Sequence, residues 1–181
     1  MPVDLAQCAT AVRAGGVIAY PAEAVFGLGC DPRNEAALAR LIDIKQRDAG
    51  KGMILIAADL EQLRDFIAPL RAADERTLRA DWPGPETWVV PAADGLSPLL
   101  TGGRDTIAVR VTAHPQAAAL CRACGPLTST SANPSGQPPL REAATVEALF
   151  GERLGAVLGG KVGGLQCPTR IRDLRSGRVL R

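Results

Sequence analysis

Short apolar runs recur along the chain, and they constrain its fold more than any other feature. Each run is rich in residues that favour β-strands and is bounded by proline, glycine or polar residues, as is typical of short buried strands. We therefore expect strands at residues 17–20, 53–57, 87–90, 105–111, 126–130 and 156–158, with a terminal hairpin formed by residues 170–174 and 178–180. The run at 105–111 alternates too little for an edge strand, so it is predicted to be central.

Amphipathic segments lie between these runs and predict helices. Asp4 and Asn34 are expected to cap helices that continue to Arg13 and to about Ile44. Strands and helices are mixed without strict alternation, and no repeat or linker divides them. The sequence thus predicts one α/β domain over residues 1–181. Further helices are expected from Asp59 to about Ile67, from Ala73 to Ala80, from Pro115 to Cys124 and from Thr145 to Phe150.

Composition argues against several classes of function. Aromatic residues make up only 3% of the chain, which disfavours binding of single-stranded nucleic acid by base stacking. The formal net charge of +2 is too small for a protein that is basic over its whole surface, although arginines gather between Arg170 and Arg181. No apolar run approaches the roughly 20 residues that span a bilayer, and the N-terminus lacks a signal pattern. A cytoplasmic protein without membrane contact is expected.

The cysteines and the single histidine offer little for metal binding. Cys121 and Cys124 form a C-x-x-C pair in an Ala-rich helical pattern, with no second pair and no histidine beside them. Reduced thiols in the core are favoured over the alternative, a zinc or redox site. His114 precedes Pro115, which is typical of a helix entry.

One polar stretch, residues 45–52, concentrates positive charge. Lys45 and Lys51 are two of only three lysines in the chain, Arg47 lies between them, and two glycines allow the backbone to bend. An apolar run follows at once, so the stretch could hold an anion at the edge of a sheet. A solvated surface turn is the alternative, because charge clusters are common on surfaces. If the chain is extended after the helix, Lys45 and Arg47 point the same way; if the helix continues, they diverge.

Two further polar stretches follow predicted strands, a long loop at 21–32 and the segment 129–136. Ligands of open α/β sheets bind beyond strand ends, where hydroxyls, amides and cations can contact phosphate oxygens. Together the three stretches predict a polyphosphate site, although an ordinary polar loop is the alternative for 129–136. Arg110 lies within a predicted strand and is expected to have a buried partner. No catalytic Ser-His-Asp set is apparent, so positioning and charge stabilisation are favoured over a covalent nucleophile.

Five motifs occur in an order that resembles the YrdC-like family. The resemblance covers nearly the whole chain, and the pairing of K-x-R with S-x-N around A-V-R is specific, whereas each motif alone is not. The motifs are Pro-Ala-Glu-Ala-Val-Phe-Gly-Leu-Gly-Cys-Asp-Pro at 21–32, Lys-Gln-Arg at 45–47 with Lys51, Trp-Pro-Gly-Pro-x-Thr at 82–87, Ala-Val-Arg-Val at 108–111 with His114 and Pro115, and Ser-Thr-Ser-Ala-Asn at 129–133.

The resemblance implies a twisted mixed sheet with flanking helices and a concave basic groove. It also implies synthesis of threonylcarbamoyl-AMP and pyrophosphate from L-threonine, bicarbonate and ATP, with Mg²⁺ arriving on the ATP. The product would pass to t6A-transfer proteins that modify tRNA. No metal site made by the protein itself is implied.

Matching positions carry the family's roles onto this chain. Lys45, Arg47 and Lys51 would be catalytic, since they would bind the phosphates and stabilise the leaving pyrophosphate. The threonine would be held by Arg110, Ser129 and Ala24, and the ATP by Arg47, Lys51, Thr106, Ser131, Asn133, Thr169 and Arg181.

One position departs from the family pattern, because Ala22 stands where threonine is usual. If the missing hydroxyl bonds a buried group, its loss weakens binding by about 1 kcal/mol or more. A double-stranded RNA or tRNA-binding module without catalysis is the main alternative function, given the C-terminal arginines. A carbamoyl-transfer enzyme with a YrdC-like domain is disfavoured, because such proteins are much longer.

Overall fold

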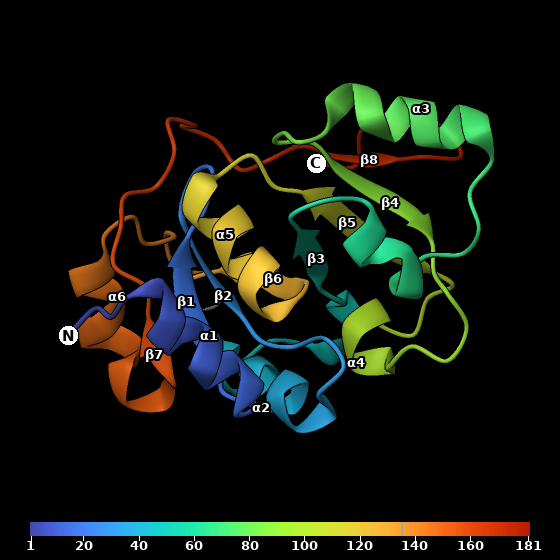
Figure 1. Ribbon diagram of the computed structural model, residues 1–181. Coiled ribbons are helices and arrows are strands. Elements are labelled where there is room, and N and C mark those ends of the chain that lie inside the picture. Colours follow the sequence, from blue (N-terminus) through green and yellow to red (C-terminus); the bar gives the residue numbers. More distant parts are fainter. Residues whose placement is uncertain (135) are drawn as a thin grey trace.

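The computed structural model describes residues 1–134 and 136–181, and in this part of the chain eight strands form one mixed sheet (Figure 1). The strand order is β7-β1-β2-β6-β3-β5-β4-β8. Neighbours pair antiparallel except for β1 with β7, β3 with β5 and β4 with β8. The strands are β1 (Ile18–Pro21), β2 (Phe26–Gly29), β3 (Ile54–Ala57), β4 (Thr87–Pro91), β5 (Thr106–Val111), β6 (Leu127–Ser131), β7 (Ala156–Val157) and β8 (Ile171–Asp173). The predicted α/β fold is confirmed, and β5 is an interior strand as expected.

Several helices begin where the sequence supplies a side-chain cap, although the helices after Arg71 and Glu142 begin without one. Asp4 forms a capping box with Gln7, Asn34 accepts a hydrogen bond from the amide of Ala37, and His114 caps α5 through its ring, which confirms its expected place at a helix entry. The α-helices are α1 (Leu5–Arg13), α2 (Glu35–Lys45), α3 (Ala72–Asp81), α4 (Pro98–Thr101), α5 (Pro115–Cys124) and α6 (Ala143–Phe150), and the 3₁₀ turns are η1 (Ala49–Lys51), η2 (Glu61–Phe66) and η3 (Gly151–Arg153).

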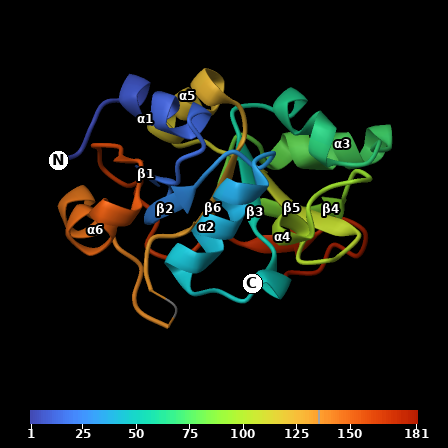
Figure 2. The same cartoon turned by 90° about the horizontal axis from the view of Figure 1, so that it is seen from below.

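Both faces of the sheet are packed, but unequally. One face meets a large core to which α2, α3, α4 and α6 contribute. The other face meets a smaller core in which α1 and α5 cover Ile18, Tyr20, Ile56 and Leu127 (Figure 2). Since α1 and α5 pack over only part of this second face, the rest of it is free to form a cavity.

The segment 21–32 corrects one expectation, because it contains strand β2 rather than a continuous loop. Its glycines serve close packing between strands. A Cβ atom added at Gly29 would lie 2.1 Å from the carbonyl oxygen of Thr128, and one at Gly27 would lie 3.3 Å from the Tyr20 ring. Glycines that resembled turn residues in the sequence therefore mark a strand squeezed between two neighbours.

Two helix starts also differ from expectation. Asp59 does accept a hydrogen bond from the Gln62 amide, but the helix that follows is the 3₁₀ turn η2. Thr145 lies inside α6, whose N-cap is Glu142. Glu142 forms an isolated β-bridge with Lys161, and this bridge fixes the chain just before the helix.

The last residues form the expected hairpin, since Arg172 bridges Val179 across the turn at Gly177, whose φ is +69°. Throughout residues 1–134 and 136–181, every helix falls short of the length and hydrophobicity needed to cross a bilayer.

A cationic cavity on the open part of the sheet

A cavity of about 730 Å³ lies on the part of the sheet that α1 and α5 leave open. Its floor includes side chains that share one face of five adjacent strands. Strand pairing places Ser129, Ile54, Ala108, Val89 and Asp173 in one row across β6, β3, β5, β4 and β8. Because side chains alternate along a strand, Thr106 and Arg110 face the cavity with Ala108, while Val109 enters the large core.

Five cationic side chains line the cavity, against the two carboxylates Glu23 and Asp173. Both carboxylates already accept hydrogen bonds, Glu23 from Arg110 and Thr112 and Asp173 from Ser176. Such an excess of positive charge in a concave site favours an anionic ligand. The cations are Arg47, Lys51, Arg104, Arg110 and Arg181.

Burial and the neighbouring cations lower the pKa values of two arginines in the cavity. Burial lowers the pKa of Arg47, and the charges of Arg181 and Arg104 lower it further. Burial also lowers the pKa of Arg181, with a contribution from Arg110. Each of these shifts records a charge placed at a cost, which a bound anion would offset.

The two cations of the K-x-R motif are directed apart by Gln46, which ends α2 in the left-handed conformation with φ 47° and ψ 49°. Arg47 then lines the cavity and donates to the Thr130 hydroxyl at 3.1 Å and to the Gly52 carbonyl at 2.6 Å. Its Nε is buried and has no hydrogen-bond partner among the described residues. Lys51 also lines the cavity.

Lys45 lies outside the cavity lining. Its ammonium donates to the carbonyl oxygens of Ser131 and Asn133 at 2.6 and 2.5 Å, and to Asn133 Oδ1 at 3.0 Å. Burial lowers the pKa of Lys45 to about 8, and the charge of Arg47 adds to this effect. The hydroxyl of Ser131 also donates to Asn133 Oδ1, at 2.6 Å. Lys45 thus joins the end of α2 to the chain that leaves β6.

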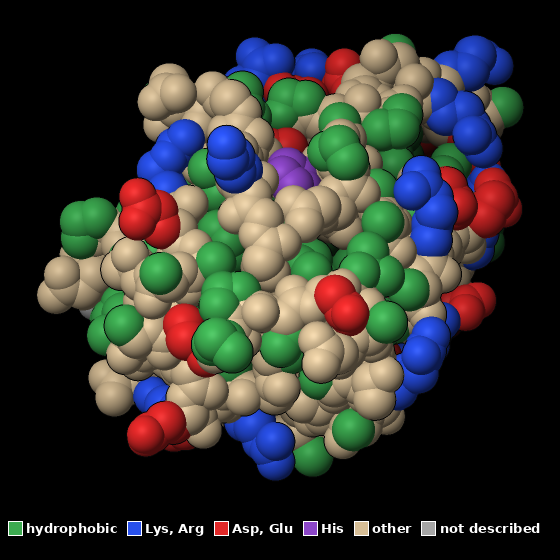
Figure 3. Space-filling view, turned by 60° about the vertical axis from the view of Figure 1, so that its left-hand side comes forward, with side chains coloured by type: hydrophobic (Ala, Val, Ile, Leu, Met, Phe, Trp, Pro, Cys, Tyr) green, Lys and Arg blue, Asp and Glu red, His purple; other side chains and the backbone are tan. Residues whose placement is uncertain are grey.

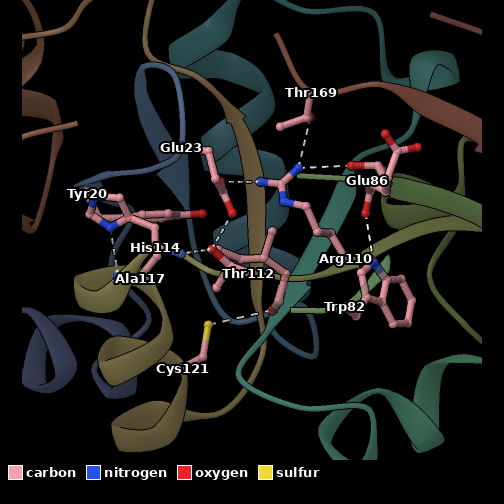
Figure 4. A network of polar contacts seen from close by, with 12 residues as sticks. Tyr20, Glu23, Trp82, Glu86, Arg110, Thr112, His114, Ala117, Cys121 and Thr169 are labelled. Atoms are coloured by element: carbon pink, nitrogen blue, oxygen red, sulfur yellow. Dashed lines mark hydrogen bonds and ion pairs between the residues drawn. The ribbon is translucent and has the colours of Figure 1, made fainter. Parts of the chain in front are cut away.

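Arg110 has the buried partner that its place in a strand predicted. Its Nη2 donates to Glu23 Oε2 at 3.2 Å, and both side chains are more than nine-tenths buried. Its Nη1 donates to the hydroxyls of Thr87 and Thr169 at 2.9 and 3.0 Å. Figure 4 shows the guanidinium held between Glu23 and Thr169. Its Nε is buried and has no hydrogen-bond partner in the described structure, so the hydrogen-bonding capacity of the guanidinium is not fully used.

The network continues behind Glu23. Glu23 Oε1 accepts from the Thr112 hydroxyl at 2.6 Å, and Thr112 Oγ1 accepts from the backbone amide of His114 at 3.1 Å (Figure 4). The segment that follows β7 packs on the same residues, because Gly163 N donates to the Ala22 carbonyl and Leu165 N to the Glu23 carbonyl. A Cβ atom at Gly163 would lie 2.5 Å from the Glu23 carbonyl oxygen, so only glycine allows this approach.

The structure brings most of the candidate residues to one cavity. Asn133 lies beside Lys45, outside the lining. The residues that reach the lining are Ala24, Arg47, Lys51, Thr106, Arg110, Ser129, Ser131, Thr169 and Arg181. Sequence reasoning missed Glu23, Thr87, Thr130 and Arg104. For Glu23 a signal existed, since a buried strand arginine calls for a carboxylate, but the sequence does not reveal which one.

The surroundings of the C-x-x-C thiols favour their protonated form. Burial raises the pKa of Cys121, and it raises that of Cys124 to about 11. Within the described residues, no group of three or more His, Cys, Asp or Glu side chains is arranged to hold a metal ion.

Known proteins resemble this chain in sequence and in fold. The family model Sua5/YciO/YrdC, described as "Telomere recombination", matches residues 10–181. The chain belongs to this family. A threonylcarbamoyl-AMP synthase of Halorhodospira halophila is 55% identical over 181 residues, which cover 99% of this chain and 95% of that protein. The enzyme of the same name from Aliivibrio fischeri is 51% identical, and 98% of each chain is covered.

Solved structures of Sua5/YciO/YrdC proteins share the fold. The crystal structure of P. abyssi Sua5 complexed with L-threonine matches with a TM-score of 0.91 and 31% identity, over 98% of this chain and 53% of that chain. This chain thus spans about half the length of that Sua5. E. coli YciO matches with a TM-score of 0.85 and 28% identity, over 98% of this chain and 87% of that one.

Proposed function

We propose that this protein catalyses the synthesis of threonylcarbamoyl-AMP from L-threonine, bicarbonate and ATP, with release of pyrophosphate. The observation that carries the proposal is the single cavity in which five cations surround a floor of hydroxyls and small apolar side chains. Relatives that are 51–55% identical bear the name of this enzyme, and a related structure holds L-threonine.

The reaction requires no covalent nucleophile from the protein. The threonine nitrogen forms a bond to the bicarbonate carbon, and water leaves to give a carbamate. A carbamate oxygen then attacks the α-phosphorus of ATP, the bond from that phosphorus to the bridging oxygen breaks, and pyrophosphate departs. An anion attacks an anion in this step, so dense positive charge and fixed positions are the main needs.

The proposed roles follow the geometry of the cavity. Arg47 and Lys51 bind the phosphates, and Arg110, which lines the cavity, binds the carboxylate or carbamate of threonine. Lys45 supports catalysis by holding Ser131 and Asn133 in place. Ser129 and Ala24 complete the threonine side, and the remaining ATP contacts come from Thr106, Ser131, Thr169 and Arg181, whereas Asn133 acts from outside the lining.

ATP is expected to enter as its magnesium complex, as a substrate. The cavity lining offers only the two carboxylates Glu23 and Asp173, and the described residues form no group of three or more His, Cys, Asp or Glu side chains, so the lining does not fit a metal site made by the protein. Mg²⁺ would then be held by phosphate oxygens and water. We place the reaction in the cytoplasm, where t6A-transfer proteins and tRNA would receive the product. Residues 1–181 are proposed to act as one domain, since the sheet takes strands from both ends of the chain.

The test is an assay of pyrophosphate release from ATP, with threonine or bicarbonate omitted in turn as controls. Release should depend on both, and Arg47→Ala and Lys51→Ala should each abolish most of it. Arg122→Ala is a matched control, because Arg122 is exposed on α5 and does not line the cavity. Wild-type rates in both cavity variants would refute the assignment of the site.

An RNA-binding role without catalysis is less well supported. On the face drawn in Figure 3, Lys and Arg side chains are interspersed with Asp and Glu and form no continuous basic surface among the described residues. The C-terminal arginines are partly neutralised, since Arg170, Arg172 and Arg175 pair with Glu86, Asp81 and Asp105. Such a role would show as RNA affinity that falls steeply with salt and survives Lys51→Ala.

A further inference from the structure

Three consecutive carbonyl groups in the η1 loop are held by guanidinium groups. Arg104 donates to the Gly50 carbonyl through Nη1 at 3.0 Å and to the Lys51 carbonyl through Nη2 at 2.7 Å. Arg47 donates to the next carbonyl, that of Gly52, at 2.6 Å. The backbone on both sides of Lys51 is therefore fixed by charged hydrogen bonds, which are about twice as strong as neutral ones.

The exposed side chain of Arg104 lies between two turns. Gly52 and Gly102 both have positive φ angles, and a Cβ atom at either would lie 2.9 Å from Arg104 Nη2. A Cβ atom at Gly102 would also lie 2.6 Å from the Gly50 carbonyl oxygen. Positive φ angles and neighbouring backbone atoms restrict both positions to glycine, and the absence of side chains there leaves room for the guanidinium beside the loop.

The side chain of Lys51, in contrast, is left unengaged. It is exposed and lines the cavity, and within the described residues its ammonium has no hydrogen-bond or ion-pair partner. Arg104 likewise has no carboxylate partner in the described structure, and its charge adds to the lowering of the Arg47 pKa. A neutral amide side chain could also bridge these two turns. The positive charge of Arg104 therefore adds something beyond cross-linking only if an anion binds nearby.

We propose that Arg104 is a positioning residue for Lys51. By fixing the carbonyls of Gly50 and Lys51, it holds the Lys51 ammonium at the end of the cavity where the outer phosphates of ATP bind. The inference rests on the proposed function for the identity of this anion, but the underlying claim concerns only a polyphosphate group. Arg104 is therefore expected to affect polyphosphate binding and to leave threonine binding unchanged.

The test measures inorganic pyrophosphate binding by calorimetry and the KM values for ATP and threonine. Arg104→Gln should weaken pyrophosphate binding and raise the KM for ATP by about tenfold each, with the KM for threonine unchanged. Arg104→Lys should weaken pyrophosphate binding nearly as much, because an ammonium retains the charge but cannot span two carbonyls in a fixed fork. Arg122→Gln removes a charge outside the cavity and is the control.

A double-mutant cycle with Lys51→Met separates positioning from simple charge. If Arg104 acts through Lys51, Arg104→Gln should weaken pyrophosphate binding much less when Lys51→Met is already present. Independent losses that multiply, or an effect of Arg104→Gln no larger than that of the control, would overturn the proposal. A positive cycle in a protein that releases no threonine-dependent pyrophosphate would reject the proposed function and leave this inference standing.

Discussion

Replacing Glu23 by glutamine tests how the cavity is built. The substitution preserves volume, so no void is created, but it leaves the Arg110 guanidinium without its counter-charge. Both side chains are nearly inaccessible to water, at 4% and 8% exposure. Breaking one side of such a buried pair costs about 3–5 kcal/mol. Because Arg110 keeps its bonds to Thr87 and Thr169, we expect about 3 kcal/mol, at the lower end of this range.

The free energy of unfolding can be measured by urea titration with tryptophan fluorescence. Trp82 and Trp88 are both buried, so their emission should report loss of the core. The loss should also appear as a fall in Tm of roughly 6–12 °C, since 1 kcal/mol corresponds to about 2–4 °C in a protein of this size. Glu61→Gln is a matched control: Glu61 pairs with Arg64 at the surface and is 69% exposed, so its loss should cost about 1 kcal/mol or less.

The double variant Glu23→Gln/Arg110→Met tests whether the buried ion pair causes the loss of stability. If the cost of Glu23→Gln arises from an unpaired buried charge, removing that charge should recover part of the stability. The double variant should then lose about 2 kcal/mol less than the sum of the two single losses. Strict additivity would show that the pair contributes no coupling, and the buried ion pair would then not account for the placement of Arg110.

Three further outcomes are expected. Activity should fall as pH rises through about 8, because Lys45 then loses the proton that holds Ser131 and Asn133. The free energy of unfolding, measured by urea titration, should not fall in that range, since the unfolded lysine, with its higher pKa of 10.5, binds more protons than the folded one. A pH–rate profile that stays flat through pH 8 would contradict the role of the Lys45 proton. Gly163→Ala should push the segment after β7 away from Glu23 and raise the KM for threonine, and an equal rise for ATP would show a general distortion instead. Ala22→Thr should lower the KM for threonine about fivefold if the added hydroxyl reaches the ligand, whereas an unchanged KM would remove Ala22 from the threonine site.

The arrangement of strands and helices could largely be predicted from the sequence, because local signals determine it. Short β-branched runs became strands, and Asp4, Asn34 and His114 became caps through their own side chains. Strand β2 was missed because its two glycines resemble a turn. Their purpose, clearance from Tyr20 and Thr128, depends on strands far apart in the sequence. Close approach of backbones is a property of the assembled sheet, and local propensity does not encode it.

The residue types of the site could be predicted from the sequence better than the contacts between them. A cluster of cations and a strand arginine were visible in the sequence, and the cavity contains both. The partner of Arg110 lies 87 residues away, and Arg104 contacts carbonyls more than 50 residues away. Contacts at such separations are set by strand order, which alternation and caps leave undetermined.

The two cations of the K-x-R motif illustrate how one local angle divides a motif between two tasks. An extended chain at Gln46 would have pointed Lys45 and Arg47 to the same side, but the left-handed conformation turns them apart. A lysine ammonium has three donors, and Lys45 uses three contacts to fix the backbone beyond β6. An arginine has five, so Arg47 can hold the Gly52 carbonyl and the Thr130 hydroxyl and keep three further N–H groups. Exchanging the two residue types would therefore leave the cavity with a lysine that keeps one donor after these two contacts, where the arginine keeps three.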